Sequence, residues 1–362
     1  IGKLLLQNTP PEKLEENIFD IVNQLNVGID TMSQPAEKTQ LAQLNLTAGR
    51  KAKAAAAYEA GVRYLRVAME LLPADCWQSH YYLTLAIYES TAEAEYLNVN
   101  YEDSKNLVDM VVQKAKTLVE KVNIYQLQIQ SYNAQNRLVE ALNTGLEVLK
   151  LLGISFPQNP KALNIMAGLI NTKLSLGLRR IEDLANLPEM TDPNKQAIMR
   201  ISSGIVSSAV QTKPQLLPLL TFMMIQQCVK YGNSLYASIA YVYYGAILCR
   251  LGDINSGYQF GELAIMLLDK FPSRSIKSKV YAVFSCFITH WKSDLNSVLG
   301  YLREGFQTGL ETGALEYEGY CVNEYCNYKL LMGEPLDMVD EETGKYDKFM
   351  HDLNVKMLVQ HI

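Results

Sequence analysis

The sequence predicts an all-α protein that forms a superhelix of stacked antiparallel helix pairs. Apolar residues recur at helical spacing along the chain, and no segment shows the alternation of a strand. Turn signals recur roughly 40 residues apart, a spacing typical of repeats that consist of two helices. Residues 122–153 contain one such unit, in which two helical segments meet at Gln135 and Asn136. A single helix pair cannot bury both of its faces, so we expect neighbouring pairs to stack on one another.

The first third of the chain contains the clearest helix boundaries. We expect a helix that begins at Thr9 and Pro10, where a cap residue precedes a proline, and that ends near Gly28. Further helices are predicted over 37–45, 46–72, 76–96 and 101–122. The stretch 46–72 is rich in alanine, the residue with the highest helix propensity, and Pro73 follows it. We therefore predict one continuous helix there.

Proline and glycine divide the later part of the chain into further helices. A helix over 162–187 is predicted after Asn159-Pro160, and another begins at Asp192-Pro193. Turns comparable to the one at residues 135–136 are predicted at Leu97-Asn98, Leu251-Gly252-Asp253, Lys292-Ser293-Asp294 and Met332-Gly333-Glu334. Several turns in one register favour a repeat architecture, although helical repeats serve many functions.

The composition is typical of a well-packed protein in a reducing compartment. Of the 362 residues, 48% are hydrophobic and 20% are charged, which is typical of a folded chain. The net charge is −5, and Lys and Arg do not gather in one stripe, which argues against nucleic acid as a partner. No apolar run approaches the roughly 20 residues that span a bilayer, and no signal peptide precedes the fold. The six cysteines form no CxxC pair, so we expect reduced core thiols, a cytoplasmic location and no membrane partner.

The sequence lacks the motifs that catalysis or metal binding would require. Gly344-Lys345 has neither the upstream glycine nor the following Ser or Thr of a phosphate-binding loop. No HRD or DFG kinase signature occurs. His80, His290, His351 and His361 are scattered and do not have the spacing of zinc ligands. We therefore predict no catalytic, cofactor-binding or metal-ligating residue, and no enzyme activity in this chain itself.

One surface pattern suggests a binding groove. On the first helix of the unit at 122–153, the positions that avoid the core stripe are all amides. The matching positions one repeat earlier include two acids and a tyrosine. The candidate groove residues are Glu89, Glu93, Tyr96, Asn123, Gln126, Gln130 and Asn133. Amides both donate and accept hydrogen bonds, so such a groove would suit an extended neutral or basic peptide. The alternative is a solvated helix face without a ligand.

The corresponding positions of the later repeat, Ile239, Val242, Ala246 and Cys249, are apolar. An apolar patch of this kind marks a contact, either with a neighbouring helix or with a partner domain or second copy. Nearby tyrosines, at 236, 241, 243 and 244, allow either a small-ligand pocket or simple aromatic packing.

The unit at 122–153 resembles a tetratricopeptide repeat. The residues that carry the resemblance are Tyr125, Ile129, Tyr132, the turn Gln135-Asn136 and the pair Glu140-Ala141. Ile129 departs from the small residue that is usual there, so looser or shifted packing is expected at this position. The resemblance implies a superhelix of helix pairs whose first helices line a concave surface.

A wider resemblance covers IGKLLL at the start of the chain and the runs at residues 44–72, 75–102 and 129–157. Together these look like the helical region of very large bacterial signalling proteins. Such proteins join a Ser/Thr kinase, an AAA/STAND-type ATPase, helical repeats, a GAF domain and a sensor histidine kinase. The resemblance implies that residues 1–30 join a preceding ATPase-type domain, that 31–157 form TPR-like repeats, and that 158–362 continue them. It also implies that the chain is a piece of a larger, ATP-dependent kinase of two-component type.

These observations lead to two functional hypotheses. The first is a non-catalytic scaffold or regulatory module that binds protein segments or adjoining domains of the parent kinase, with a homodimer also open. The alternative is the small-molecule sensor arm of a STAND-type ATPase regulator, with its pocket among Tyr236 to Tyr244.

Overall fold

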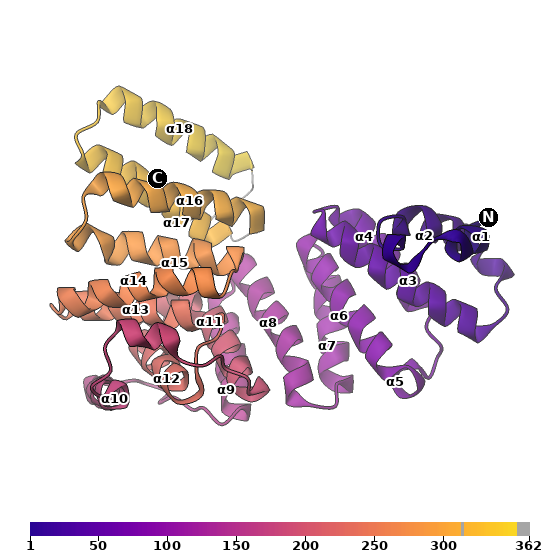
Figure 1. The fold of residues 1–362 in the computed structure, drawn as a ribbon, viewed down its shortest axis with the longest axis horizontal. Coiled ribbons are helices and arrows are strands. Elements are labelled where there is room, and N and C mark those ends of the chain that lie inside the picture. The colour runs from indigo at the N-terminus through magenta and orange to yellow at the C-terminus, as the bar shows by residue number, and fades with distance from the viewer. Residues whose placement is uncertain (313–314, 353–362) are drawn as a thin grey trace. The chain divides into compact units, whose positions relative to one another are not determined.

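The computed structural model describes residues 1–312 and 315–352, and this part of the chain is all-α (Figure 1). It contains α-helices and four short 3-10 helices. Within the described ranges the only strand-like pairing is one isolated bridge, between Glu189 and Asn233. Every helix in these ranges is either too short or too polar to span a bilayer. The predicted all-α class is confirmed.

The chain divides into two compact units, residues 1–151 and 152–362. The helices of the first unit are α1 (Gly2–Asn8), α2 (Ile18–Val27), α3 (Pro35–Ala54), α4 (Tyr58–Glu70), α5 (Cys76–Ser79), α6 (Tyr81–Leu97), α7 (Tyr101–Lys114), α8 (Leu118–Ala134) and α9 (Leu138–Leu151). Each of the pairs α3/α4, α6/α7 and α8/α9 packs along its length, and α6 also contacts α4 and α8. Residues 1–30, expected to join a preceding domain, pack here: Ile18 and Ile21 share a core with Leu41 and Leu65.

The second unit is built in the same way. Its helices are α10 (Ala162–Leu176), α11 (Pro193–Thr212), α12 (Leu216–Tyr231), α13 (Ala237–Arg250), α14 (Ile254–Lys270), α15 (Arg274–Phe287), α16 (Leu295–Thr312), α17 (Leu315–Leu331) and α18 (Leu336–Asp352). Consecutive helices from α11 to α18 contact one another, and α13, α15 and α17 also touch in turn (Figure 1). The core gathers around Phe222, Tyr241, Tyr244, Phe260 and Phe284.

The predicted single helix over 46–72 is wrong, because the structure breaks it into α3 and α4 at Ala55–Ala57. Two glycines explain why the chain turns there. A Cβ on Gly49 would lie 2.5 Å from the Leu65 Cγ, and one on Gly61 would lie 3.3 Å from the Gly49 carbonyl oxygen. The two helices therefore approach backbone to backbone. The packing energy of this close contact outweighs the helix propensity of the alanines. That propensity favours alanine over other residues, proline excepted, by about 1 kcal/mol or less per residue.

Other predicted boundaries also needed correction. The helix expected over 101–122 ends at Lys114, because Thr117 forms a capping box with Glu120 and begins α8. The helix expected over 162–187 ends at Leu176, before Gly177 at φ +62°. At Thr9 and Pro10 only a 3-10 turn follows, and α2 begins at Ile18.

Other boundaries are confirmed. The helix that begins at Pro193 is capped as predicted, because the Asp192 side chain accepts hydrogen bonds from the N–H groups of Asn194 and Lys195. The helix that was expected to end near Gly28 has Gly28 as its C-cap.

Five helix pairs are closed by the same backbone turn. In these five turns the residue with positive φ is Ala56, Val99, Asn136, Gly252 or Gly333, with φ from 56° to 89°. In each turn the residue after the one with positive φ donates its N–H to the carbonyl oxygen five residues before it, at 2.8–3.3 Å. The residue with positive φ itself donates its N–H to the carbonyl oxygen three residues before it. This is the Schellman motif, which satisfies the last carbonyls of a helix. Four of the turns predicted from sequence, at 97–98, 135–136, 251–253 and 332–334, are confirmed.

Val99 is the least suitable residue among these turns, because a β-branched side chain is strained at its φ of 64°. Its side chain is 65% exposed and contributes little packing. We expect Val99→Gly to raise the free energy of unfolding by about 0.5–1 kcal/mol. Val139→Gly, at a comparably exposed position in the first turn of α9, is the matched control and should lower it by about 0.3–0.5 kcal/mol. Thermal unfolding measures both; a loss of stability in Val99→Gly would contradict the strain argument.

Candidate functional site

The seven candidate groove residues lie on α6 and α8, the first helices of two neighbouring pairs in the first unit. Glu93, Asn123 and Gln130 are exposed, whereas Glu89, Tyr96, Gln126 and Asn133 are half-buried. No residue of the set is buried in the core. The helical register therefore places the set at a surface, where the amides of α8 can be reached by another chain.

Cations of α3 face the acids of α6, a feature that sequence reasoning missed. Lys53 forms an ion pair with Glu93, and the Arg50 Nε donates to the Ser90 Oγ at 3.1 Å. Each of these two contacts joins residues 40 positions apart, which is the repeat spacing itself. The signal was thus present in the sequence, but assigning 46–72 to one helix hid α3 as a repeat of α6. The Lys53–Glu93 ion pair reduces the negative charge of this surface, which was the reason to expect a basic peptide.

Glu89 is a residue of this surface whose pKa lies near neutral pH. Burial raises the pKa of its carboxyl to about 7; the nearby Arg50 lowers this pKa, while Glu120 and Glu93 raise it further. Glu120 is held by hydrogen bonds from the Tyr81 hydroxyl and the Lys116 and Thr117 N–H groups. The negative charge at Glu89 therefore changes near neutral pH.

Tyr96 takes part in the packing between α6 and α7. Its ring centroid lies 6.2 Å from that of Tyr101, the first residue of α7. Burial raises the pKa of the Tyr96 hydroxyl to about 12, so it stays protonated. Between α7 and α8, next to Tyr101 and Tyr132, a cavity of about 10 Å³ could hold at most about one water molecule.

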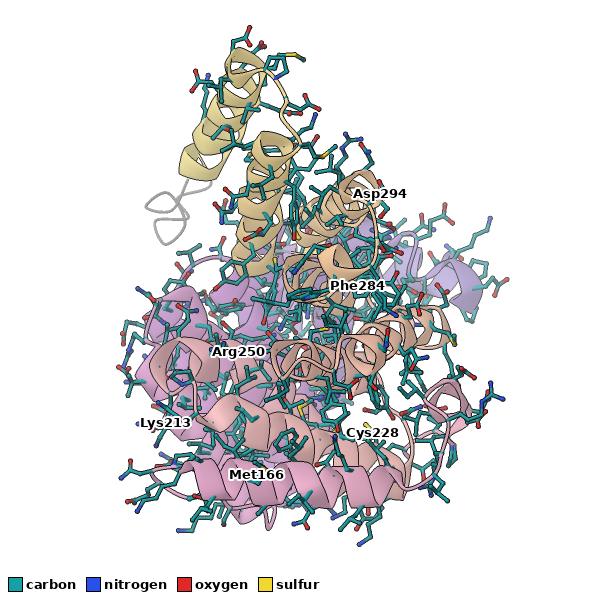
Figure 2. The ribbon with its side chains drawn as sticks, turned by 90° about the vertical axis from the view of Figure 1, so that its left-hand side faces the viewer. Met166, Lys213, Cys228, Arg250, Phe284 and Asp294 are labelled. Carbon is teal, nitrogen blue, oxygen red and sulfur yellow. The ribbon has the colours of Figure 1, made fainter. Side chains whose placement is uncertain are left out.

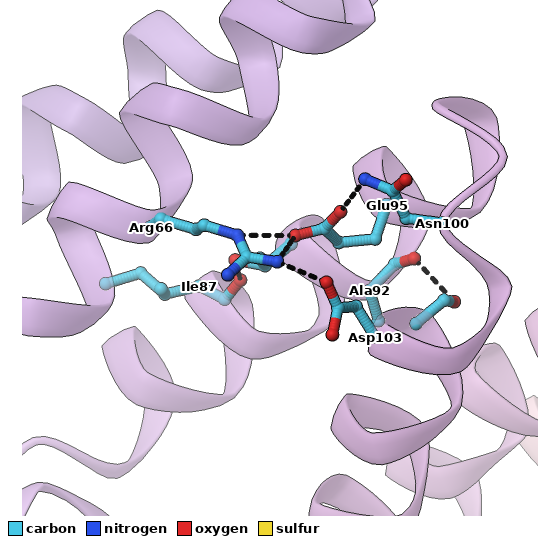
Figure 3. A network of polar contacts seen from close by, with 8 residues as sticks. Arg66, Ile87, Ala92, Glu95, Asn100 and Asp103 are labelled. Atoms are coloured by element: carbon cyan, nitrogen blue, oxygen red, sulfur yellow. Dashed lines mark hydrogen bonds and ion pairs between the residues drawn. The ribbon is translucent and has the colours of Figure 1, made fainter.

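A polar network fixes α4 to the α6/α7 pair (Figure 3). Glu95 is fully buried, and its Oε1 accepts from the Arg66 Nε at 2.6 Å. Its Oε2 accepts from the Asn100 Nδ2 at 2.7 Å. The same guanidinium donates to the Asp103 Oδ2 at 2.6 Å, and hydrogen bonding to Glu95 raises the pKa of Arg66. Neighbouring repeats are thus held in a defined register by a satisfied buried charge.

In the second unit, the predicted apolar contact is internal. Ile239, Val242 and Cys249 are at most 4% exposed and Ala246 is half-buried, all in contact with the unit's own core. The tyrosines also pack. The Tyr244 ring lies edge-on to Phe260 at 4.8 Å, and the Tyr241 hydroxyl donates to the Asn233 Oδ1 at 3.2 Å. Of the two readings left open for this cluster, the geometry favours aromatic packing.

The chemistry of the described residues is that of a packed helical protein. Among them, no group of three or more His, Cys, Asp or Glu side chains could hold a metal ion. The six cysteines are free thiols, and burial raises the pKa of Cys228 and Cys321 to about 12, which disfavours the reactive thiolate. The side chain of His351, and His361 as a whole, lie outside the described part of the chain.

Comparison with known proteins gives one informative match. No protein-family model matches the chain. The chain is 23% identical over 373 residues to hybrid signal transduction histidine kinase G of Dictyostelium discoideum. The match covers 95% of this chain but 11% of that protein, so the chain spans about a tenth of its relative's length. Nearly the whole chain is therefore similar to a region of a signalling histidine kinase.

Proposed function

We propose that the chain is a non-catalytic scaffold and regulatory module of a multidomain signalling kinase. The observation that carries the proposal is that 95% of the chain matches a segment amounting to 11% of a hybrid histidine kinase. The described residues supply helix pairs and surfaces that can hold protein. The module contributes contacts, and catalysis belongs to other domains of the longer protein.

In this proposal the repeats transmit orientation between the domains they join. Each helix pair contacts mainly its neighbours, so a displacement at one pair must pass through the next. The Arg66–Glu95 pair lies at such a junction, between α4 and α6. Because separating the pair would leave the buried Glu95 carboxylate without its cation, this junction moves as one piece.

The partner of the α6/α8 surface is an extended protein segment, supplied by an adjoining domain. The amides Asn123, Gln126 and Gln130 offer donors and acceptors to its backbone. Lys53 compensates the charge of Glu93, so a neutral segment suits this surface better than a strongly basic one. TPR-like packing, with first helices along a concave face, is part of the same proposal.

Thermal shift and light scattering separate this function from the sensor alternative. The chain is melted alone, with each adjoining domain of the full-length protein, and with a metabolite panel. Stabilisation by a domain without a metabolite effect supports the module. A metabolite that raises the melting temperature by several degrees, with the effect lost in Tyr243→Ala, would favour the sensor arm instead.

A further inference from the structure

Helix α10 is an edge helix of the second unit with two apolar faces. Its inner face packs on α12: a Cβ on Gly168 would lie 2.8 Å from the Phe222 ring, and the Gln226 side chain donates to the buried Thr172 hydroxyl at 3.0 Å. The unit's core also takes up Ile165 and Leu169. These contacts account for one side of the helix only.

The outer face of α10 carries a second apolar stripe. Leu163 is 81% exposed, Met166 57%, Ile170 52% and Leu174 73%. Their spacing of three, four and four residues places them along one line of the helix, as in a seam that receives another helix. Figure 2 shows Met166 on the helix at the lower edge of the unit, below the core residue Phe284. A helix that is apolar on both sides is typical of a helix buried between two layers.

The charge along α10 is positive. Residues 152–181 contain four Lys or Arg and no Asp or Glu, and one of these cations, Arg180, forms an ion pair with Glu182 just beyond them. Residues 211–233, which include α12, contain two more cations and no acid. Lys161 and Lys173, on and beside α10, are exposed. The Arg179 guanidinium donates to the last carbonyls of the helix, those of Ser175 and Leu176. The chain as a whole has a charge of −5, so this basic surface is a local feature.

These observations select among the possible occupants. A second copy of α10 would bring lysines against lysines, which is unfavourable. A helix that lies on a lipid surface keeps a polar face opposite its apolar one, whereas the face of α10 opposite the stripe is largely apolar and packs on α12. An acidic protein helix satisfies both the stripe and the charge.

We propose that the outer face of α10, formed by Leu163, Met166, Ile170 and Leu174, is the docking site for an amphipathic helix that carries acidic residues beside its own apolar stripe. The inference rests on the proposed function, in which the chain binds protein segments, and adds the chemical class of one such segment. It concerns a site distinct from the amide surface of the first unit.

The test uses three synthetic helical peptides of about 20 residues, a length at which helices form in water. All share one leucine stripe, and their flanking residues are all Glu, mixed Glu and Lys, or all Lys. Fluorescence anisotropy measures their binding to the 362-residue chain at about 0.15 M salt. We expect the Glu-flanked peptide to bind at least about tenfold more tightly than the Lys-flanked one.

Matched variants assign the binding to α10. Ile170→Gln with Leu174→Gln should weaken binding of the Glu-flanked peptide by at least about tenfold. Leu251→Gln with Met266→Gln, at comparably exposed positions elsewhere in the second unit, should leave it unchanged. Because all four side chains are at least half exposed, both variants should keep the wild-type melting temperature.

Several outcomes would overturn the inference. They are equal affinity for all three peptides, binding of none, and binding that survives in the α10 variant. Sedimentation with phosphatidylserine vesicles that depends on the α10 stripe would assign the face to a membrane. Self-association lost in the α10 variant would assign it to a second copy. If an adjoining domain binds the chain but none of the peptides does, the docking site on α10 is refuted and the proposed function still stands.

Discussion

Replacing Glu95 with glutamine is expected to lower the free energy of unfolding by about 2–3 kcal/mol. The carboxylate is fully buried and accepts hydrogen bonds from both Arg66 and Asn100. A glutamine keeps the shape of the side chain, but it removes the negative charge that faces Arg66. It also replaces one carboxylate oxygen with an amide NH2 group, which would then face the donor of Arg66 or of Asn100. The guanidinium, half exposed in the wild type, can recover only part of the lost interaction from water.

Chemical denaturation of the 362-residue chain measures this loss, and hydrogen exchange of α4, α6 and α7 locates it. Glu93→Gln is the matched control, because its exposed ion pair with Lys53 should be worth less than about 1 kcal/mol. Wild-type stability in Glu95→Gln would mean that the network in Figure 3 does not hold the repeats together.

The same substitution at Glu318 is expected to have the opposite effect. Glu318 is also fully buried, but neither carboxyl oxygen has a hydrogen-bond partner among the described residues. It lies where α15, α16 and α17 meet: a Cβ on Gly309 would be 2.9 Å from the Glu318 Cβ and 3.1 Å from the Ser278 hydroxyl. Burial raises the pKa of Glu318 to about 7. Glu318→Gln should therefore stabilise the chain by about 2 kcal/mol near pH 8.

The pH dependence identifies the cause of this effect. In the unfolded chain a glutamate releases its proton near pH 4.3, whereas folded Glu318 keeps it to about pH 7. The penalty is absent below about pH 4, grows as the pH rises through this window, and is complete above about pH 7. The difference between Glu318→Gln and wild type should accordingly be near zero at about pH 4 and largest at about pH 8.

Denaturation curves at several pH values test this dependence. Glu304→Gln, at an exposed carboxylate on α16, is the control and should show no comparable trend. A constant difference across the pH range would show that Glu318 is not an uncompensated buried acid.

Local chemistry decided which parts of the fold could be predicted. The turns at Gln135-Asn136 and Leu251-Gly252 are encoded by residues that tolerate positive φ, and the sequence located both. The turn at Ala56 has no such signal, because alanine favours helix continuation. It exists because Gly49 and Gly61 allow α3 and α4 to approach closely, and that contact joins segments whose pairing the sequence did not reveal.

The candidate site shows the same division. Helical periodicity was sufficient to place Asn123, Gln126 and Gln130 at the surface of α8. The pairing of Lys53 with Glu93 required the register between α3 and α6, which depends on the missed turn. The outer stripe of α10 was overlooked because periodicity cannot distinguish an apolar face that packs internally from one that is exposed.

The most direct test of the proposed function is a calorimetric titration of the chain with the adjoining domains of the full-length protein. Three forms are compared: wild type, Asn123→Ala with Gln126→Ala and Gln130→Ala, and the control Asn106→Ala with Gln113→Ala and Asn143→Ala, whose amides are exposed on α7 and α9. We predict that an adjoining domain binds wild type and control equally, and binds the α8 variant at least about tenfold more weakly. Equal binding to all three forms, or none to any, would contradict a module that acts through this surface.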